Sequence, residues 1–118
     1  MKIRDILNKD TATISFEVFP PKKSTDFGNV EAAALGIAAL QPAYMSVTYG
    51  AGGSTKGHTI ALAEEIQKKH NVPTVAHLTC VCADRSSIGA ALTEMQAAGI
   101  ENILALRGGL PKDFDGEV

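Results

Sequence analysis

Four short apolar runs alternate with segments of helical periodicity, and this alternation constrains the fold of the chain most strongly. The predicted strands are residues 13–19, 43–49, 74–82 and 102–107. The predicted helices are residues 24–40, residues 56–70 and a third segment that Asp84 or Ser86 caps and Gly99 ends. Strict alternation of strand and helix predicts a parallel sheet covered by helices.

The first three predicted strands have one apolar face and one polar face. Side chains alternate across a strand, so Glu17 lies opposite Phe16 and Val18. By the same rule, Thr48 and His77 lie on the polar faces of the second and third strands. Parallel strands that are covered on both faces are usually apolar throughout. The polar faces therefore predict an open surface or a lumen on one side of the sheet.

The spacing of the polar residues favours a barrel. Glu17, Thr48, His77 and Arg107 follow one another at 31, 29 and 30 positions, and one βα unit of an eightfold barrel takes about 30 residues. We expect the four residues at one level, at the C-terminal ends of neighbouring strands, where such barrels build their active sites. The predicted class is α/β, a (βα)8 barrel of the TIM type. Periodicity alone does not separate this barrel from an open doubly wound sheet.

A chain of 118 residues is long enough for about the first four βα units of such a barrel, which is half of the usual total. Four strands alone would leave the first and the fourth as unpaired edges. We therefore interpret residues 1–118 as one domain, the N-terminal half of a longer barrel. An autonomous half-barrel dimer is the alternative.

Composition excludes several classes of protein. The formal net charge is −2 without a basic stripe, so we expect no nucleic-acid partner. No apolar run approaches the roughly 18 residues that span a bilayer, and the start "MKIRDILNKD" lacks the apolar core of a secretion signal. We expect a cytoplasmic protein without a membrane partner.

Two further motifs have open or structural interpretations. The stretch "YGAGGSTKG", residues 49–57, matches neither the dinucleotide fingerprint nor a P-loop. It leads into a predicted helix, so it either binds an anionic or polar ligand or is a plain βα turn. Cys80 and Cys82 lie on the strand face opposite His77, and we interpret them as buried structural thiols. We predict no metal site, because such a site needs several converging ligands.

Four motifs together resemble the N-terminal half of bacterial methylenetetrahydrofolate reductases, in order and at the spacing of that family. They are "SFEVFPPK" (residues 15–22), "SVTYGAGGST" (residues 46–55), "AHLTCV" (residues 76–81) and "NILALRG" (residues 102–108). The resemblance implies a βα barrel that binds FAD noncovalently at the C-terminal ends of its strands.

The resemblance also implies a two-stage reaction. NADH or NADPH reduces FAD, and the flavin then reduces 5,10-methylenetetrahydrofolate to 5-methyltetrahydrofolate, a step of one-carbon metabolism that serves methionine biosynthesis. The folate ring must first open, which requires a proton at N10. Glu17 matches the acid of the family, and partial burial in a barrel mouth would favour its protonated form. A folate substrate and a homo-oligomer are expected.

Carried over residue by residue, the resemblance predicts the binding site. Thr48 is expected near the position that nicotinamide and folate share, so Glu17 and Thr48 are the predicted substrate contacts. The other predicted flavin contacts are Tyr49, Ala51, His77, Leu106, Arg107 and Gly108. One position departs from the family: Gly109 stands where the pattern "LRGD" has Asp.

Two other functions stay open on the sequence. The chain could be a noncatalytic half-barrel fragment or assembly module without cofactor, or a folate-binding relative with different chemistry. We expect the 118 residues alone to have little or no activity, because half of the barrel mouth is absent.

Overall fold

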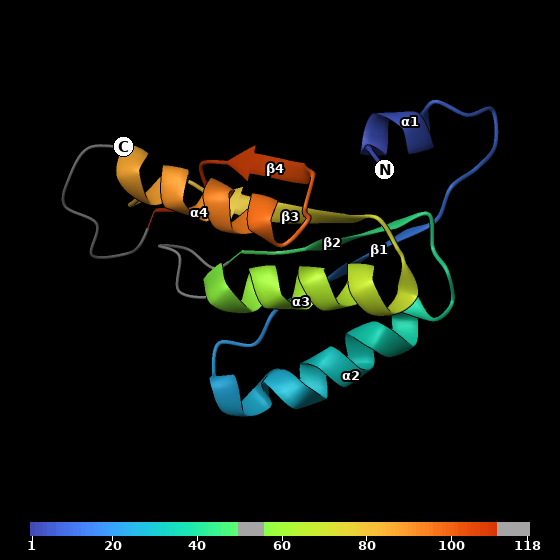
Figure 1. Cartoon of the computed structure of the whole chain (residues 1–118), viewed down its shortest axis with the longest axis horizontal. Helices are drawn as coiled ribbons and strands as arrows, with labels where there is room; N and C mark the ends of the chain where they lie inside the picture. Colours follow the sequence, from blue (N-terminus) through green and yellow to red (C-terminus); the bar gives the residue numbers. More distant parts are fainter. Residues whose placement is uncertain (50–55, 111–118) are drawn as a thin grey trace.

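The computed structural model describes residues 1–49 and 56–110, in which strands and helices alternate (Figure 1). The strands are β1 (Ser15–Val18), β2 (Tyr44–Val47), β3 (Thr74–Thr79) and β4 (Asn102–Leu106). The helices are α1 (Ile3–Leu7), the 3-10 turn η1 (Ser24–Asp26), α2 (Phe27–Ala38), α3 (Lys56–His70) and α4 (Arg85–Ala97). None of the helices in these two ranges is long and apolar enough to cross a membrane.

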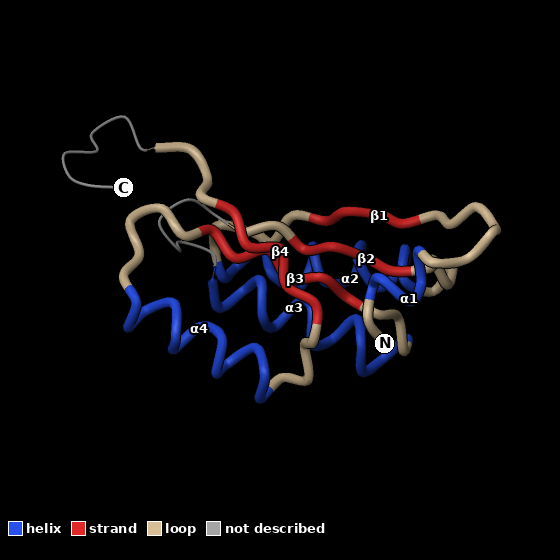
Figure 2. The backbone as a smooth tube through the Cα atoms, turned by 90° about the horizontal axis from the view of Figure 1, so that it is seen from above, coloured by secondary structure: helices blue, strands red, loops and turns tan. Residues whose placement is uncertain are grey.

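The four strands form one parallel sheet in the order β1-β2-β3-β4. Crossovers between parallel strands are almost always right-handed, so successive crossovers in one direction place the connecting helices on the same face. Figure 2 shows α2, α3 and α4 together on one side of the strands. A doubly wound sheet would reverse its strand order and carry helices on both faces. The described part of the chain is therefore wound in one direction, as in part of a βα barrel.

The core lies between the sheet and this helix layer. The predicted apolar strand faces supply its sheet side, and small and branched side chains of the helices fill the rest. The fully buried members include Met45, Val47, Ala76, Ala38, Leu62, Ala63, Ile66 and Met95. The two-faced pattern that the sequence predicts is thus confirmed in β2 and β3. On β1, at the edge of the sheet, Val18 is buried but Phe16 is exposed.

The ends of the elements follow local chemistry. Asp84 caps α4, since its side chain accepts a hydrogen bond from the Ser87 N–H at 2.8 Å while the Ser87 hydroxyl accepts one from the Asp84 N–H at 3.0 Å. Gly99 follows the helix with a φ of 79°, the left-handed conformation that commonly ends helices. Strand β3 is shorter than predicted, because the chain turns after Thr79 and Cys82 has a φ of 61°.

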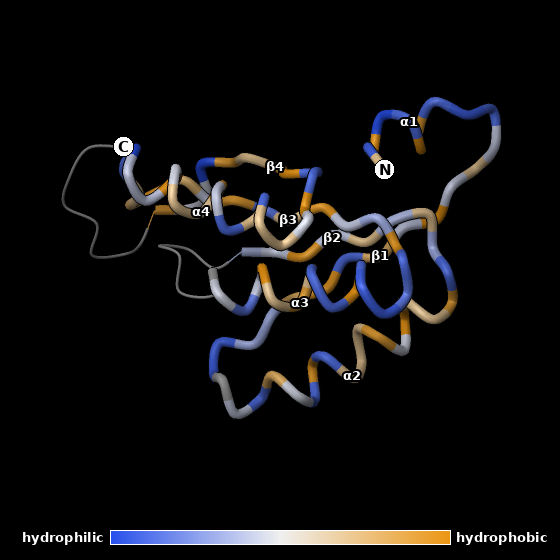
Figure 3. Tube along the Cα trace, in the orientation of Figure 1, coloured by the Kyte–Doolittle hydropathy of each residue, from blue (hydrophilic) through white to orange (hydrophobic). Residues whose placement is uncertain are grey.

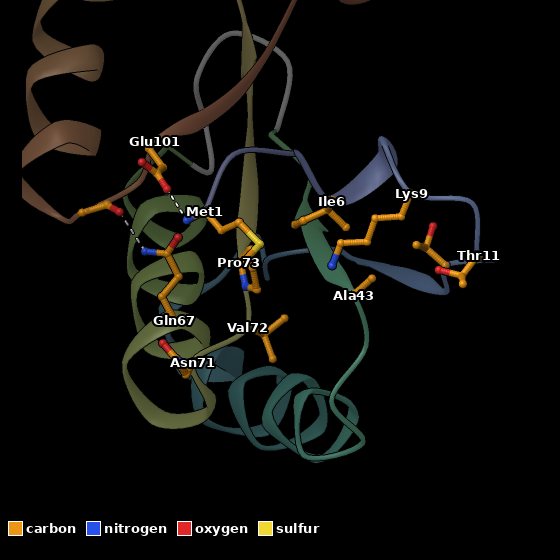
Figure 4. A pocket seen from close by; sticks show the side chains of 12 residues that line it. Met1, Ile6, Lys9, Thr11, Ala43, Gln67, Asn71, Val72, Pro73 and Glu101 are labelled. Atoms are coloured by element: carbon orange, nitrogen blue, oxygen red, sulfur yellow. Dashed lines mark hydrogen bonds and ion pairs between the residues drawn. The ribbon is translucent and has the colours of Figure 1, made fainter. Parts of the chain in front are cut away.

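Helix α1 was not predicted, and it packs near the N-terminal ends of the strands. Ile6 is buried, and the Ile3 N–H donates a hydrogen bond to Asn102 Oδ1 at 3.0 Å. Asn102 Nδ2 in turn donates to the Met1 carbonyl at 2.9 Å. A cavity of about 510 Å³ lies beside this contact (Figure 4). Its walls include residues just before the strands, such as Pro73 and Ala43, so it lies at the end of the sheet opposite to that where barrel active sites form.

Candidate functional site

Glu17, Ser46 and His77 come together on the face of the sheet that the helices leave uncovered. They belong to β1, β2 and β3. The Ser46 hydroxyl donates a hydrogen bond to Glu17 Oε1 at 2.8 Å. His77 Nε2 lies 3.3 Å from the same oxygen. Strands β2 and β3 thus direct polar side chains at one carboxylate oxygen of β1.

These contacts explain how a strand of apolar composition accommodates Glu17. Its side chain is 48% exposed, whereas that of His77 is only 14% exposed. A half-exposed carboxylate retains part of its hydration, and the hydroxyl and the imidazole replace part of what is lost. The cluster can therefore hold a carboxyl group in a fixed position and offer it to a molecule that lies over the sheet.

The strand register corrects the prediction that the four spaced residues lie at one level. Ser46, rather than Thr48, is the Cα partner of Glu17, and Thr48 lies two residues further along the chain. Leu104 is the partner of His77, so Arg107 follows three residues later, beyond the end of β4. Thr48 and His77 are level with each other, because their spacing of 29 positions equals the offset between β2 and β3. Glu17 lies two residues before this level and Arg107 three residues after it, because their spacings of 31 and 30 positions exceed the strand offsets of 29 and 27.

Thr48 is held through its backbone at the end of β2. Its N–H donates to the Val18 carbonyl at 3.1 Å, and its carbonyl accepts a hydrogen bond from the Thr59 hydroxyl at 2.8 Å. Thr59 is fully buried in α3. Thr48 therefore has a fixed position just past the end of β2, two residues beyond Ser46.

Tyr49 lies partly buried against the core rather than with Glu17. Burial raises the pKa of its phenol, and the nearby Cys80 and Glu94 add to this effect. The Tyr49 carbonyl accepts a hydrogen bond from the Thr79 hydroxyl at 3.3 Å. Its contact with flavin stays a prediction, and Ala51 lies outside the described residues.

The segment after β4 runs close to the segment after β3. The Leu106 and Arg107 carbonyls accept hydrogen bonds from the N–H groups of Cys80 and Val81, both at 2.8 Å. Gly108 follows with a φ of 84°, and a Cβ there would lie 2.3 Å from Thr79 Cγ2. The chain can therefore pass here only without a side chain.

Gly109 is in a different situation, because nothing lies within 4 Å of where its Cβ would be. Packing among the described residues therefore leaves room for a Cβ at this position, where the family pattern has Asp. The side chain of Arg107 is exposed, and its Nε donates to the Gly108 carbonyl at 3.1 Å.

Ser46 was not predicted as a member of this cluster. Alternation along the strand puts it on the same face as Thr48, but the register that brings it beside Glu17 is not readable from spacing. The interpretation of Cys82 as a buried thiol is wrong, because Cys82 is exposed beyond the strand, while Cys80 is partly buried. Among residues 1–49 and 56–110, no group of three or more His, Cys, Asp or Glu side chains is placed to hold a metal ion.

The fold and the site together define a class of protein. It is a parallel α/β protein wound in one direction, with Glu17, Ser46 and His77 clustered on the open face of its sheet. Residues 2–117 match the sequence profile of the methylenetetrahydrofolate reductase family. The chain belongs to this family.

Relatives come from fungi, plants and bacteria. Methylenetetrahydrofolate reductase 2 of Schizosaccharomyces pombe is 39% identical over 98% of this chain and 19% of its own length. Methylenetetrahydrofolate reductase (NADH) 1 of Arabidopsis thaliana is 35% identical over 97% of this chain and 19% of its own. The 5,10-methylenetetrahydrofolate reductase of Pectobacterium carotovorum is 31% identical over 93% of this chain and 39% of its own. The chain thus spans about a fifth to two fifths of these relatives.

Proposed function

We propose that this chain forms the acid-bearing part of an FAD-dependent methylenetetrahydrofolate reductase that uses NADH or NADPH. The observation that carries the proposal is the position of Glu17, held by Ser46 and His77 on the open face of the sheet. Membership of the reductase family supplies the substrate class and the cofactor. A closed eightfold barrel belongs to the same proposal.

The residues at the C-terminal end of the sheet suit a flavin nucleotide. Leu106 presents an exposed apolar side chain that can lie against an aromatic ring system, and the exposed guanidinium of Arg107 can pair with a diphosphate. When bound, FAD supplies hydride transfer between the nicotinamide and the folate. The predicted contacts at Thr48, Tyr49, Ala51, His77 and Gly108 are part of this proposal.

Glu17 acts in it as the general acid. Its carboxyl group donates a proton to N10 of the bound folate, so that the five-membered ring opens and the carbon to be reduced becomes an iminium cation. Thr48 contacts the substrate next to the acid. It lies just past the end of β2, two residues beyond Ser46. A positioned general acid typically contributes about 10²- to 10⁴-fold to a rate.

A hybrid enzyme tests this role. Residues 2–117 of this chain replace the matching segment of the Pectobacterium carotovorum enzyme, which supplies the remaining length. We expect Glu17→Gln to lower folate turnover at least about 100-fold while leaving NAD(P)H oxidation by a quinone acceptor unchanged, because only the folate half needs the proton. Glu65→Gln on α3, whose carboxylate pairs with Lys69, is the matched control.

Retained folate turnover in the Glu17→Gln hybrid would remove Glu17 as the acid. The noncatalytic alternative has its own test. A hybrid that purifies without flavin absorbance, next to a yellow parent enzyme, would favour an assembly module without cofactor.

A further inference from the structure

Glu17 uses its two carboxyl oxygens unequally. Among the described residues, the two polar contacts of the carboxylate both go to Oε1: the Ser46 hydroxyl at 2.8 Å and His77 Nε2 at 3.3 Å. We propose that Ser46 and His77 determine which oxygen carries the acidic proton, so that Glu17 donates from Oε2. This inference rests on the proposed role of Glu17 as the acid, and it adds Ser46 as a positioning residue.

The chemistry of a carboxyl group supports the assignment. A protonated carboxyl group has one O–H oxygen and one carbonyl oxygen, and the carbonyl oxygen can accept two hydrogen bonds. The Ser46 hydroxyl donates to Oε1 and His77 Nε2 lies 3.3 Å from the same oxygen, which makes Oε1 the carbonyl oxygen. A proton on Oε1 would lie against both groups and displace the Ser46 hydrogen bond. The proton therefore resides on Oε2.

The Ser46 hydroxyl and His77 also assist the transfer itself. When Oε2 gives up its proton, negative charge spreads over both oxygens of the carboxylate. The Ser46 hydroxyl already donates to Oε1 and His77 Nε2 lies 3.3 Å from it, so the charge develops beside polar groups that are already in place. In the proposed arrangement the His77 Nε2 carries a hydrogen, which leaves Nδ1 for other partners.

The sheet makes this arrangement rigid. Ser46 is the direct Cα partner of Glu17 on the neighbouring strand, and parallel strands lie about 4.8 Å apart. His77 lies two residues beyond Val75, the partner of Ser46, and reaches the carboxylate from the third strand. Because each side chain comes from a hydrogen-bonded strand, the direction of the carboxyl group is set by backbone geometry.

Kinetics of the hybrid holoenzyme test the role of Ser46. Ser46→Ala removes the hydroxyl, and we expect kcat for folate reduction to fall about tenfold while the folate KM stays within about twofold. Ser46→Thr keeps a hydroxyl and is expected to restore kcat to within about twofold of the parent. Ser15→Ala, which removes a hydroxyl from the same face of β1, is the control and is expected to have no effect. NAD(P)H oxidation by a quinone is expected to be unchanged in all three variants.

The double variant separates this inference from the proposed function. If Ser46 acts through Glu17, then Ser46→Ala adds no further loss in a Glu17→Gln background. An inactive Glu17→Gln variant beside a fully active Ser46→Ala variant overturns the inference and leaves the function standing. A fully active Glu17→Gln variant overturns the function itself. Equal losses in both half-reactions, or a raised KM with unchanged kcat, also overturn the role of Ser46.

A spectroscopic measurement on the 118-residue chain gives a second test. With ¹⁵N-labelled histidine, we expect the neutral His77 ring to show the Nε2–H tautomer. With ¹³C-labelled glutamate, we expect the carboxyl resonance of Glu17 to shift in Ser46→Ala, to return in Ser46→Thr and to stay in place in Ser15→Ala. An Nδ1–H tautomer, or a resonance unmoved by Ser46→Ala, would overturn the proposal.

Discussion

Glu17 shows at the residue scale how one position serves both stability and chemistry. An unpaired carboxylate in an apolar strand would be costly, and the structure reduces this cost through partial exposure, the Ser46 hydroxyl and the neighbouring His77. The same two side chains orient the group for the proposed proton transfer. The contacts that let the fold accommodate the carboxylate thus also fix its position.

Gly108 gives a prediction at this scale. We expect Gly108→Ala to destabilise the chain by at least about 1–2 kcal/mol, because its φ of 84° is unfavourable for L-residues and the new Cβ would clash with Thr79. Gly109→Ala is the neighbouring control, since its Cβ position is open. Urea unfolding followed by circular dichroism measures both. Equal stabilities of the two variants would contradict the close approach of the segments after β3 and β4.

At the scale of elements, the helices carry apolar residues on the sheet side and tolerate glycines on the other. Helix α2 contains Gly28 and Gly36, both exposed, and α4 contains Gly89. A glycine within a helix loses more backbone entropy on folding than alanine does. These helices therefore derive their stability from packing on the sheet rather than from intrinsic propensity.

Replacing Gly36 by alanine should accordingly stabilise the chain. We expect Gly36→Ala to raise the free energy of unfolding by about 0.5–1 kcal/mol, because nothing lies within 4 Å of the new Cβ and the residue lies inside α2. Gly99→Ala is the contrasting variant and should lower stability, because Gly99 has a φ of 79°. Urea titrations compare the midpoints at equal slope. A decrease for Gly36→Ala would show that the helix is distorted or contacted at this position.

At the scale of the whole molecule, the described residues form an open sheet with two edge strands. Strands β1 and β4 each have one neighbour among the described residues, and both carry exposed apolar side chains. Figure 3 shows apolar residues along β4, at the edge of the sheet. Unpaired edges of this kind pair readily with other strands. In the proposed barrel they would meet further βα units.

The exposed edge strands β1 and β4 predict that the 118-residue chain self-associates. We expect the chain to associate as its concentration rises, and Leu104→Lys to reduce this association, because a lysine on an edge strand opposes edge pairing. Leu104 is 50% exposed on β4, whereas Leu40, the control position, is 73% exposed and lies outside the sheet. Size-exclusion chromatography with light scattering measures the mass. A monomer at every concentration, or an equal effect of Leu40→Lys, would contradict the prediction.

Much of the fold was predictable because it depends on local periodicity. The four strands, the helices between them, the cap at Asp84 and the end of α4 at Gly99 were all expected and are confirmed. The short helix α1 was missed, because its five residues hold too few apolar positions to show a period, and long-range contacts with Asn102 help to hold it in place.

The sequence by itself determined which side chains face the helices and which face the open side of the sheet, since alternation along a strand is a property of the backbone. It also determined the family, through four motifs at fixed spacing. Only the tertiary structure decided that Ser46 rather than Thr48 lies beside Glu17, and that His77 reaches the same oxygen. Register depends on how neighbouring strands slide past each other as their helices pack, and this offset is not encoded within any single strand.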